Sequence, residues 1–185
     1  MSHSPRAMPI QWTSYDAPVG RLVIVEGDEG PIVVEYPVRA ALLRWEDEVR
    51  RAMPRVRVEP GPCERTREWL DRYFDGDPDP FPFPYHLGRY FDPSPAHVIV
   101  WRALWGIPYG GTRSFDEVAH ETGLHPRHVG QLVASNHLAI LIPCHRIVGK
   151  RGDLVGYAGG LSTKRRLLDH ELRTAGVVLR SQSGA

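Results

Sequence analysis

A proline-rich run near the middle of this chain limits the folds that it can adopt. Six of the 17 prolines fall within residues 75–96, in the run DGDPDPFPFPYHLGRYFDPSPA. Proline fixes φ and lacks an amide N–H, so neither a helix nor a central strand continues through such a run. The run predicts an N-terminal domain over residues 1–77, an ordered connector over 78–95 with a few aromatic side chains packed down, and a C-terminal domain over 96–185.

The N-terminal part alternates strand-like and helix-like patterns. Val- and Ile-rich runs at 10–14, 22–26 and 32–36 are separated by Gly- and Pro-containing turns, a pattern typical of an antiparallel meander. Two amphipathic helices are expected to follow, over 40–53 and 64–74. Their inward-facing residues are predicted to be Leu42, Trp45, Val49 and Ala52 in the first helix, which Pro54 ends, and Thr66, Trp69, Leu70 and Tyr73 in the second, which Gly76 closes. We therefore expect an α+β domain.

The C-terminal part carries a helix-turn-helix pattern. After a predicted helix over 97–105, Ser114 and Glu117 have the spacing of a capping box and begin a helix that ends at Gly123. A three-residue link leads to a second short helix from Pro126, which is the spacing of a helix-turn-helix. Gly130 and Ala134 would share one face of this reading helix and allow close approach to a groove, although packing on a neighbouring helix explains them equally well.

The charge distribution favours a nucleic-acid partner for the second half only. The net charge of +1 combines −4 over residues 1–100 with +5 over 101–185, and the second stretch also holds six of the nine histidines. No apolar run approaches the roughly 20 residues that span a bilayer. Residues 1–10 lack the apolar stretch of a secretory signal, which predicts a cytoplasmic protein.

Of the two cysteines, Cys144 has the surroundings of a nucleophile. It interrupts a strand-like apolar run over 140–148 as Pro-Cys-His-Arg. Many cysteines are simply small buried hydrophobes, but Pro143 is expected to expose a turn, and the possible cations His145 and Arg146 to lower the thiol pKa. The imidazole needs a group that orients it, for which the candidates are Asp169 and Glu171.

The other cysteine, Cys63, is expected to be structural. No cluster of cysteines and histidines accompanies it in the first half of the chain. A zinc site needs several such ligands at close spacing. The sequence therefore predicts neither a metal site nor a cofactor.

The order of motifs over about residues 97–172 resembles the O6-alkylguanine-DNA alkyltransferases. The N-terminal domain is similar to that family more loosely, through the run WLDRYFDG at 69–76. The motifs that carry the resemblance are IPYG at 107–110, TRSF at 112–115, PRHVG at 126–130, Ser135-Asn136, ILIPCHR at 140–146, YAGG at 157–160 and LLDHE at 167–171.

The resemblance implies a fold and a reaction. The N-terminal domain would be ribonuclease-H-like and the C-terminal domain winged-helix-like, and the protein a monomer. The helix-turn-helix would bind the minor groove of duplex DNA while the damaged guanine flips out of the stack. Its O6 alkyl group would move irreversibly to the protein, so that each molecule acts once.

The resemblance also implies roles for individual residues. Cys144 would accept the alkyl group, His145 would act as general base through water, Glu171 would orient the imidazole, and Asn136 would be a hinge. Arg127 would fill the space that the flipped base vacates. Other DNA contacts are expected from Thr112, Arg113, Ser114, Gly130 and Ala134, and pocket contacts from Phe115, Ile147, Tyr157, Ala158, Gly159 and Gly160. Among the pocket contacts, the carbonyls of Cys144 and Ile147 would accept from the guanine amine and the Ala158 N–H would donate to O6.

Several positions depart from the family pattern. Phe115 replaces a usual Tyr, so its hydroxyl is lost while the aromatic bulk against the phosphate remains. Ala139 and His137 stand where Pro is usual, which predicts a roomier alkyl pocket. Lys164, Arg165 and Arg166 would lie in the first turn of a helix capped by Ser162 or Thr163, either as an exposed turn or beside the DNA backbone.

Two functions of other classes remain open on the sequence alone. One is a catalytically silent protein that binds alkylated bases and recruits repair factors, against which Cys144 counts. The other is a thiol hydrolase with a Cys-His-Glu set, which would turn over.

Overall fold

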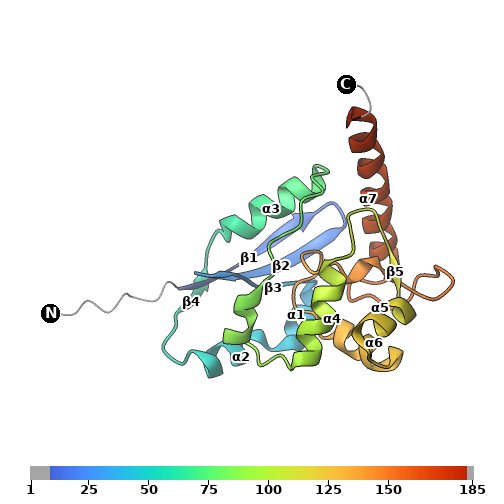
Figure 1. Ribbon diagram of the computed structural model, residues 1–185. Helices are drawn as coiled ribbons and strands as arrows, with labels where there is room; N and C mark the ends of the chain where they lie inside the picture. Colours follow the sequence, from blue (N-terminus) through green and yellow to red (C-terminus); the bar gives the residue numbers. More distant parts are fainter. Residues whose placement is uncertain (1–8, 183–185) are drawn as a thin grey trace.

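The computed structural model describes residues 9–182, in which strands and helices combine in an α+β arrangement (Figure 1). Residues 1–8, over which no secretory signal is expected, and 183–185 lie outside the described residues. The elements are, in chain order, β1 (Ile10–Ala17), β2 (Gly20–Gly27), β3 (Gly30–Glu35), α1 (Pro37–Leu43), α2 (Trp45–Ala52), β4 (Val58–Pro60), α3 (Glu64–Phe74), η1 (Tyr85–Arg89), α4 (Pro95–Trp105), β5 (Arg113–Ser114), α5 (Phe115–Thr122), α6 (Pro126–Ala134), η2 (Cys144–Arg146), β6 (Ile147–Val148) and α7 (Leu161–Gln182).

The main sheet has the strand order β3-β2-β1-β4 and is mixed. The three predicted strands form an antiparallel meander, as expected. The sequence gives no signal for β4, whose three residues pair in parallel with the start of β1. The free edge of β3 is joined to the second half of the chain, because the Val34 N–H donates to the His137 carbonyl at 2.9 Å and the Ala139 N–H to the Val34 carbonyl at 2.7 Å. The two halves of the chain therefore meet along this edge.

The single helix expected over 40–53 is wrong. Two helices, α1 and α2, are separated at Arg44, which adopts the left-handed conformation with φ 47°. The break turns Leu42 outward, with 71% of its surface exposed, and Ala52 is exposed as well. Trp45 and Val49 are buried as predicted. A continuous 3.6-residue pattern cannot reveal such a one-residue break.

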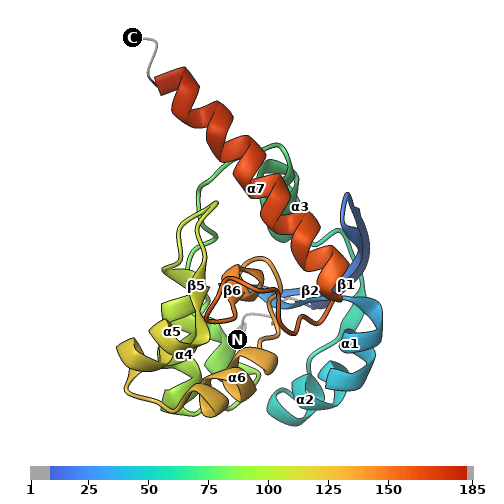
Figure 2. The same cartoon turned by 90° about the vertical axis from the view of Figure 1, so that its right-hand side faces the viewer.

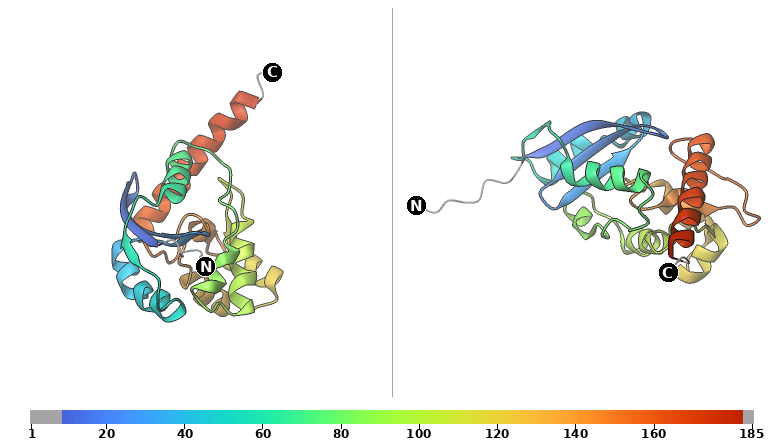
Figure 3. Two further views of the ribbon diagram at one scale, coloured as in Figure 1. Left: turned by 90° about the vertical axis from the view of Figure 1, so that its left-hand side faces the viewer. Right: turned by 90° about the horizontal axis from the view of Figure 1, so that it is seen from above.

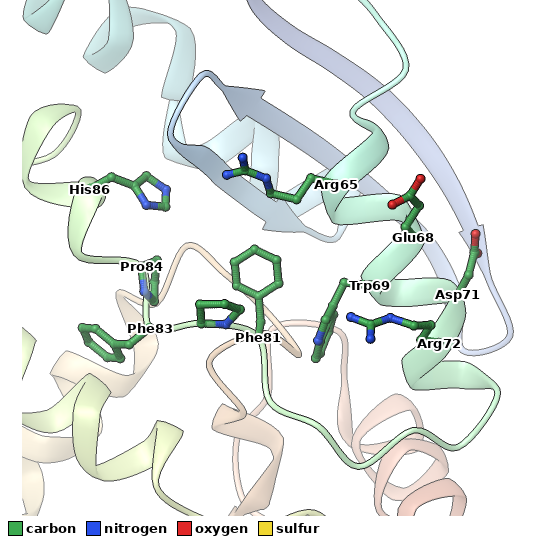
Figure 4. Close-up of a pocket in the computed structure, with 10 residues that line it drawn as sticks. Arg65, Glu68, Trp69, Asp71, Arg72, Phe81, Phe83, Pro84 and His86 are labelled. Carbon is green, nitrogen blue, oxygen red and sulfur yellow. The ribbon is translucent and has the colours of Figure 1, made fainter.

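The helix α3 and the connector follow the prediction. The helix has the predicted bounds and crosses one face of the sheet (Figure 3), with Thr66, Trp69, Leu70 and Tyr73 buried. The connector packs Phe81, Leu87, Tyr90 and Phe91 into the same core. A cavity of about 680 Å³ opens between α3 and the connector, where side chains from both segments face each other (Figure 4). The connector is thus an ordered part of the fold.

The helix-turn-helix is also present as predicted. The capping box of Ser114 and Glu117 begins α5, Gly123 ends it in the left-handed conformation with φ 69°, and Pro126 occupies the first turn of α6. The long helix α7 projects away from the other elements (Figure 2). Among residues 9–182, no helix is both long enough and apolar enough to cross a membrane.

The turn expected after Pro143 is present as η2, but it is buried rather than exposed, and of the strand-like run that it interrupts only the last two residues form a strand, β6. Residues 139–142 run through turns and a bend, and Ile140 has φ 72°. These residues are apolar because the turn is buried in the core, and burial alone does not distinguish a strand from an irregular segment.

Candidate functional site

Cys144 lies in a cavity of about 250 Å³ between the two halves of the chain. The cavity is lined by Arg39 of α1 and by Gly130 and Ala134 of α6, two helices that lie on opposite sides of the view in Figure 2. The cavity brings together seven predicted site residues: Phe115, Gly130, Ala134, Asn136, Cys144, Tyr157 and Ala158. It also contains four residues that the sequence did not indicate: Glu35, Arg39, Val133 and Gly156.

Asn136 ties the end of the reading helix α6 to the cysteine turn. Its amide Nδ2 donates to the Ile142 carbonyl at 2.9 Å, and its Oδ1 accepts from the Leu138 N–H at 3.0 Å. The side chain is buried, so these bonds are made in a low-dielectric environment. Asn136 therefore links the end of α6 to the cysteine turn, and its role as a hinge stays a prediction.

The pKa of Cys144 is not lowered as the sequence suggests. The residue is 9% exposed, and burial raises the pKa of its thiol to about 11, although the Asn136 side chain and the Lys164 charge oppose this. The expected activation by Arg146 fails because the guanidinium faces Glu171. The free protein therefore holds a neutral thiol, which needs a base at the moment of reaction.

Glu171 on α7 is the partner of the imidazole, and Asp169 is exposed on the same helix. The Oε1 of Glu171 lies 2.7 Å from His145 Nε2 and accepts a hydrogen bond from the Tyr73 hydroxyl at 2.8 Å. The Oε2 of Glu171 accepts one from the Gly110 N–H at 3.1 Å. Burial opposes ionisation, but His145 and Arg146 hold the pKa of the Glu171 carboxyl well below its usual range.

The bond to Glu171 fixes the tautomer of His145. A carboxylate only accepts hydrogen bonds, so Nε2 carries the proton and Nδ1 a free lone pair. Burial lowers the pKa of the imidazole and keeps it neutral. Nδ1 has no hydrogen-bond partner among the described residues. A buried imidazole with a free lone pair on Nδ1 is equipped to accept a proton.

Arg146 completes this network. Its Nε donates to both Glu171 oxygens at 3.1 and 3.0 Å, and a terminal nitrogen to Oε1 at 2.9 Å. The other terminal nitrogen donates to the Ile107 carbonyl at 2.6 Å. Arg146 thus anchors α7 to the cysteine turn.

Lys164, predicted to lie at the surface, is buried. The helix α7 begins at Leu161, ahead of the predicted cap, and turns Lys164 into the interior with no exposed surface. Its Nζ donates to the Val155 carbonyl at 2.6 Å and the Gly156 carbonyl at 3.4 Å, and burial lowers its pKa to about 8. Both surface interpretations of Lys164 are therefore wrong, because it secures the loop that carries Gly156 to the cavity. Arg165 and Arg166 are exposed.

The reading helix presents an open face. A Cβ built on Gly130 would meet only the Phe115 ring edge, at 3.9 Å, which argues against close packing on a neighbouring helix. Arg127 is exposed in the first turn of α6. Thr112 is exposed and Arg113 pairs with Glu121, whereas the Ser114 hydroxyl is engaged in the capping box. Among the residues predicted to contact DNA, Arg127 and Gly130 thus present an open surface, and both lie on α6.

Some predicted pocket residues lie off the cavity wall. Ile147 is buried and does not line the cavity, and Gly159 and Gly160 follow Ala158 without lining it. A Cβ on Gly159 would lie 2.5 Å from the Tyr36 ring, so this glycine makes room for a tyrosine.

Ala139 and His137 do not shape the pocket as the sequence predicts. Neither Ala139 nor His137 lines the cavity. The Ala139 N–H bonds to β3, and the His137 ring stacks on Phe91 at 4.2 Å between centroids. Both residues serve the junction between the two halves of the chain.

Cys63 is fully buried and burial raises its pKa to about 12, as suits a packing residue. Within the described part of the chain, no group of three or more His, Cys, Asp and Glu side chains is placed to hold a metal ion. Of the two cysteines, Cys144 is therefore the one that lines a cavity together with predicted site residues.

The chain is similar to known proteins along most of its length. The family model described as "6-O-methylguanine DNA methyltransferase, DNA binding domain" matches residues 95–173. The methylated-DNA--protein-cysteine methyltransferase of Mycobacterium leprae is 43% identical over 170 residues, covering 88% of this chain and 92% of the relative. The protein of that name from Mycobacterium bovis is 33% identical over 165 residues, with the same coverage. A crystal structure of Mycobacterium tuberculosis OGT in complex with DNA matches with a TM-score of 0.70 and 28% identity, covering 89% of this chain and 94% of that chain.

Proposed function

The chain belongs to the methylated-DNA--protein-cysteine methyltransferases, and from this we propose that Cys144 is the residue that takes the alkyl group from O6-alkylguanine in duplex DNA. The protein acts in direct-reversal DNA repair. The observation that carries the assignment is the set of Cys144, a His145 with a free Nδ1, and a buried Glu171 at the back of the imidazole. No other cysteine in residues 9–182 has such partners.

The proposed reaction is one displacement at the alkyl carbon. The thiol proton of Cys144 passes through water to Nδ1 of His145, and Glu171 stabilises the imidazolium that forms. The sulfur forms a bond to the alkyl carbon as the bond from that carbon to O6 breaks, and the electron pair leaves with the purine. The Ala158 N–H would donate to O6, and a proton returns to the guanine ring. The thioether on Cys144 is stable, so each molecule acts once.

Asn136 and Lys164 are proposed as positioning residues for this step. Asn136 fixes the turn that carries the thiol relative to α6, and Lys164 holds the loop with Gly156 and Tyr157 over it. The charge of Lys164 also favours the thiolate. Both residues act through the geometry and the electrostatics of Cys144.

We propose that α6 enters the minor groove with its Gly130 and Ala134 face. Both residues line the cavity that holds Cys144, so a base leaving the stack beside α6 would have a short path to the thiol. Arg127, exposed at the start of the helix, would fill the vacated space. The net charge of +5 over residues 101–185 supports contact with phosphates.

Finer aspects of the organisation are proposals as well. A ribonuclease-H-like N-terminal domain over 1–77 is supported by the mixed sheet with α3 on one face, and a winged-helix-like domain over 96–185 by the helix-turn-helix with the small β5–β6 pair. The connector over 78–95 joins them. A cytoplasmic location and a monomeric state accord with a DNA substrate.

The rival functions are less well supported. The names of the relatives do not favour a silent binding protein, and a silent protein has no need of a buried imidazole held by Glu171 directly after the cysteine in the chain. A thiol hydrolase would release its product and turn over.

The test is transfer of a labelled methyl group from an O6-methylguanine duplex to the protein. Wild type is expected to become labelled, Cys144→Ala to remain unlabelled, and Cys63→Ala, the matched control at the other free cysteine, to behave as wild type. Label on any residue other than Cys144, or no label at all, would refute the assignment.

A further inference from the structure

The N-terminal half contributes a charged pair to the cavity that holds the reactive cysteine. Glu35, the last residue of β3, and Arg39 of α1 line the same cavity as Cys144. Most of the remaining wall is apolar or aromatic and is built by Phe115, Val133, Ala134, Tyr157 and Ala158. A carboxyl group in such a wall differs sharply from its surroundings.

Glu35 has hydrogen-bonding capacity that the protein does not use. One carboxyl oxygen accepts from the Tyr36 N–H at 3.0 Å. The other lies 3.8 Å from Arg39 Nε, beyond hydrogen-bond distance. Arg39 instead donates to the Ala134 carbonyl at the end of α6. A carboxylate accepts about four hydrogen bonds, so acceptor positions of Glu35 remain open.

The burial of Glu35 makes this free capacity costly. The residue is 1% exposed, and burial raises the pKa of its carboxyl to about 7 against the opposing effects of the Tyr36 N–H and Arg39. An apolar side chain would suit a purely apolar pocket better. The position of Glu35 therefore indicates a role toward what enters the cavity.

The reaction places the O6 substituent in this cavity, because its first carbon must reach the sulfur of Cys144. A methyl group ends there. A longer substituent continues into the space that Glu35 lines. We propose that Glu35 is a specificity-determining residue, whose carboxyl accepts a hydrogen bond from the end of the O6 substituent and so favours hydroxyalkyl over alkyl groups of equal size. The inference rests on the proposed transfer to Cys144 and names the substrate class of that site.

The ionisation of Glu35 adds a second signature. Titratable and charged groups face it from each of the elements around it: Arg39 of α1, Tyr36 after β3, Cys144 of η2 and Tyr157 of the following loop, with Lys164 of α7 acting on Cys144. An ionised carboxylate accepts more strongly than a neutral acid. Preference for a hydroxyl donor should therefore increase as the pH rises through about 7.

The test compares single-turnover transfer from duplexes that carry O6-(2-hydroxyethyl)guanine and O6-propylguanine, whose substituents have nearly the same shape. The ratio of the two rates cancels effects of pH on Cys144 and His145. One hydrogen bond predicts a ratio about threefold to tenfold higher in wild type than in Glu35→Leu. Glu35→Gln should keep part of the preference but lose its pH dependence. The control Glu46→Gln, at an exposed site on α2, should match wild type.

A duplex with O6-methylguanine distinguishes a failure of the Glu35 proposal from a failure of the proposed transfer to Cys144. Methyl transfer at similar rates in wild type and both Glu35 variants, with an unchanged ratio for the longer groups, would overturn the role of Glu35 and leave the transfer function standing. No transfer from any of the three duplexes to wild type would instead overturn the proposed function.

Discussion

Replacing Glu171 with Gln removes the charge on which the buried network depends. The carboxylate accepts hydrogen bonds from Tyr73, Gly110, His145 and Arg146, and it has no exposed surface. A glutamine presents an amide NH2 where two of these donors now point. The Arg146 guanidinium, 9% exposed, would lose its only acidic partner within the described residues.

Breaking a buried ion pair from one side costs about 3–5 kcal/mol. A domain of ordinary stability has about 5–15 kcal/mol in total, so Glu171→Gln should lower the free energy of unfolding by a large fraction. The sign of the pH dependence follows from the depressed pKa of Glu171. Its contribution is fully present above the ordinary carboxyl pKa and is lost as the pH falls from there through the depressed pKa of the folded protein, so the difference between the two proteins should shrink in acid.

Urea unfolding at neutral pH and again in acid measures both effects. Asp169→Asn, at an exposed carboxylate on the same helix, is the matched control and should stay within about 0.5 kcal/mol of wild type. A Glu171→Gln protein within about 1 kcal/mol of wild type at neutral pH would contradict the account of the network.

Three further predictions concern stability, thiol electrostatics and DNA. Burial raises the pKa of Glu35 from 4.5 to about 7, so the protonated carboxyl contributes stability that is complete below pH 4.5 and is lost as the pH rises through about 7. Glu35→Gln, which stays neutral, should therefore be more stable than wild type by about 3 kcal/mol at pH 8 and equally stable in acid. Urea unfolding at the two pH values would check this. Lys164→Met removes a charge that lowers the pKa of Cys144. The change should slow methyl transfer at neutral pH about tenfold and shift the pH–rate profile to higher pH. A profile at the same pH as in wild type would exclude the electrostatic role. Arg127→Ala should slow transfer from duplex DNA but leave transfer from single-stranded DNA unchanged, and equal rates on the duplex would rule out the proposed finger.

The parts of the fold that the sequence predicts well are those with local causes. The bounds of α5 follow from a capping box and a left-handed glycine, both visible within a few residues. The helix α3 follows from a regular apolar stripe. The break at Arg44 and the short strand β4 have no comparable local signature, because each exists only through packing against the rest of the chain.

The site shows the same division. Cys144, His145 and Glu171 come from motifs whose residue types carry chemistry. The burial of Lys164 and the presence of Glu35 in the cavity depend on how α7 and β3 dock against the cysteine turn. The raised pKa of Cys144 also depends on the tertiary structure. Its neighbours in the sequence predict a lowered thiol pKa, whereas in the folded protein the thiol is buried and Arg146 bonds to Glu171 instead. Charge near a cysteine in sequence is thus a poor guide to charge near its sulfur.

The intact mass of the protein after mixing with an excess of duplex DNA that carries O6-methylguanine shows directly whether Cys144 takes the alkyl group. We expect every active molecule to gain the mass of one methyl group in place of a hydrogen, peptide mapping to place this group on Cys144, and the reaction to stop at one equivalent. Continued release of repaired DNA beyond one equivalent, or an unmodified Cys144 in protein that has repaired DNA, would contradict this expectation.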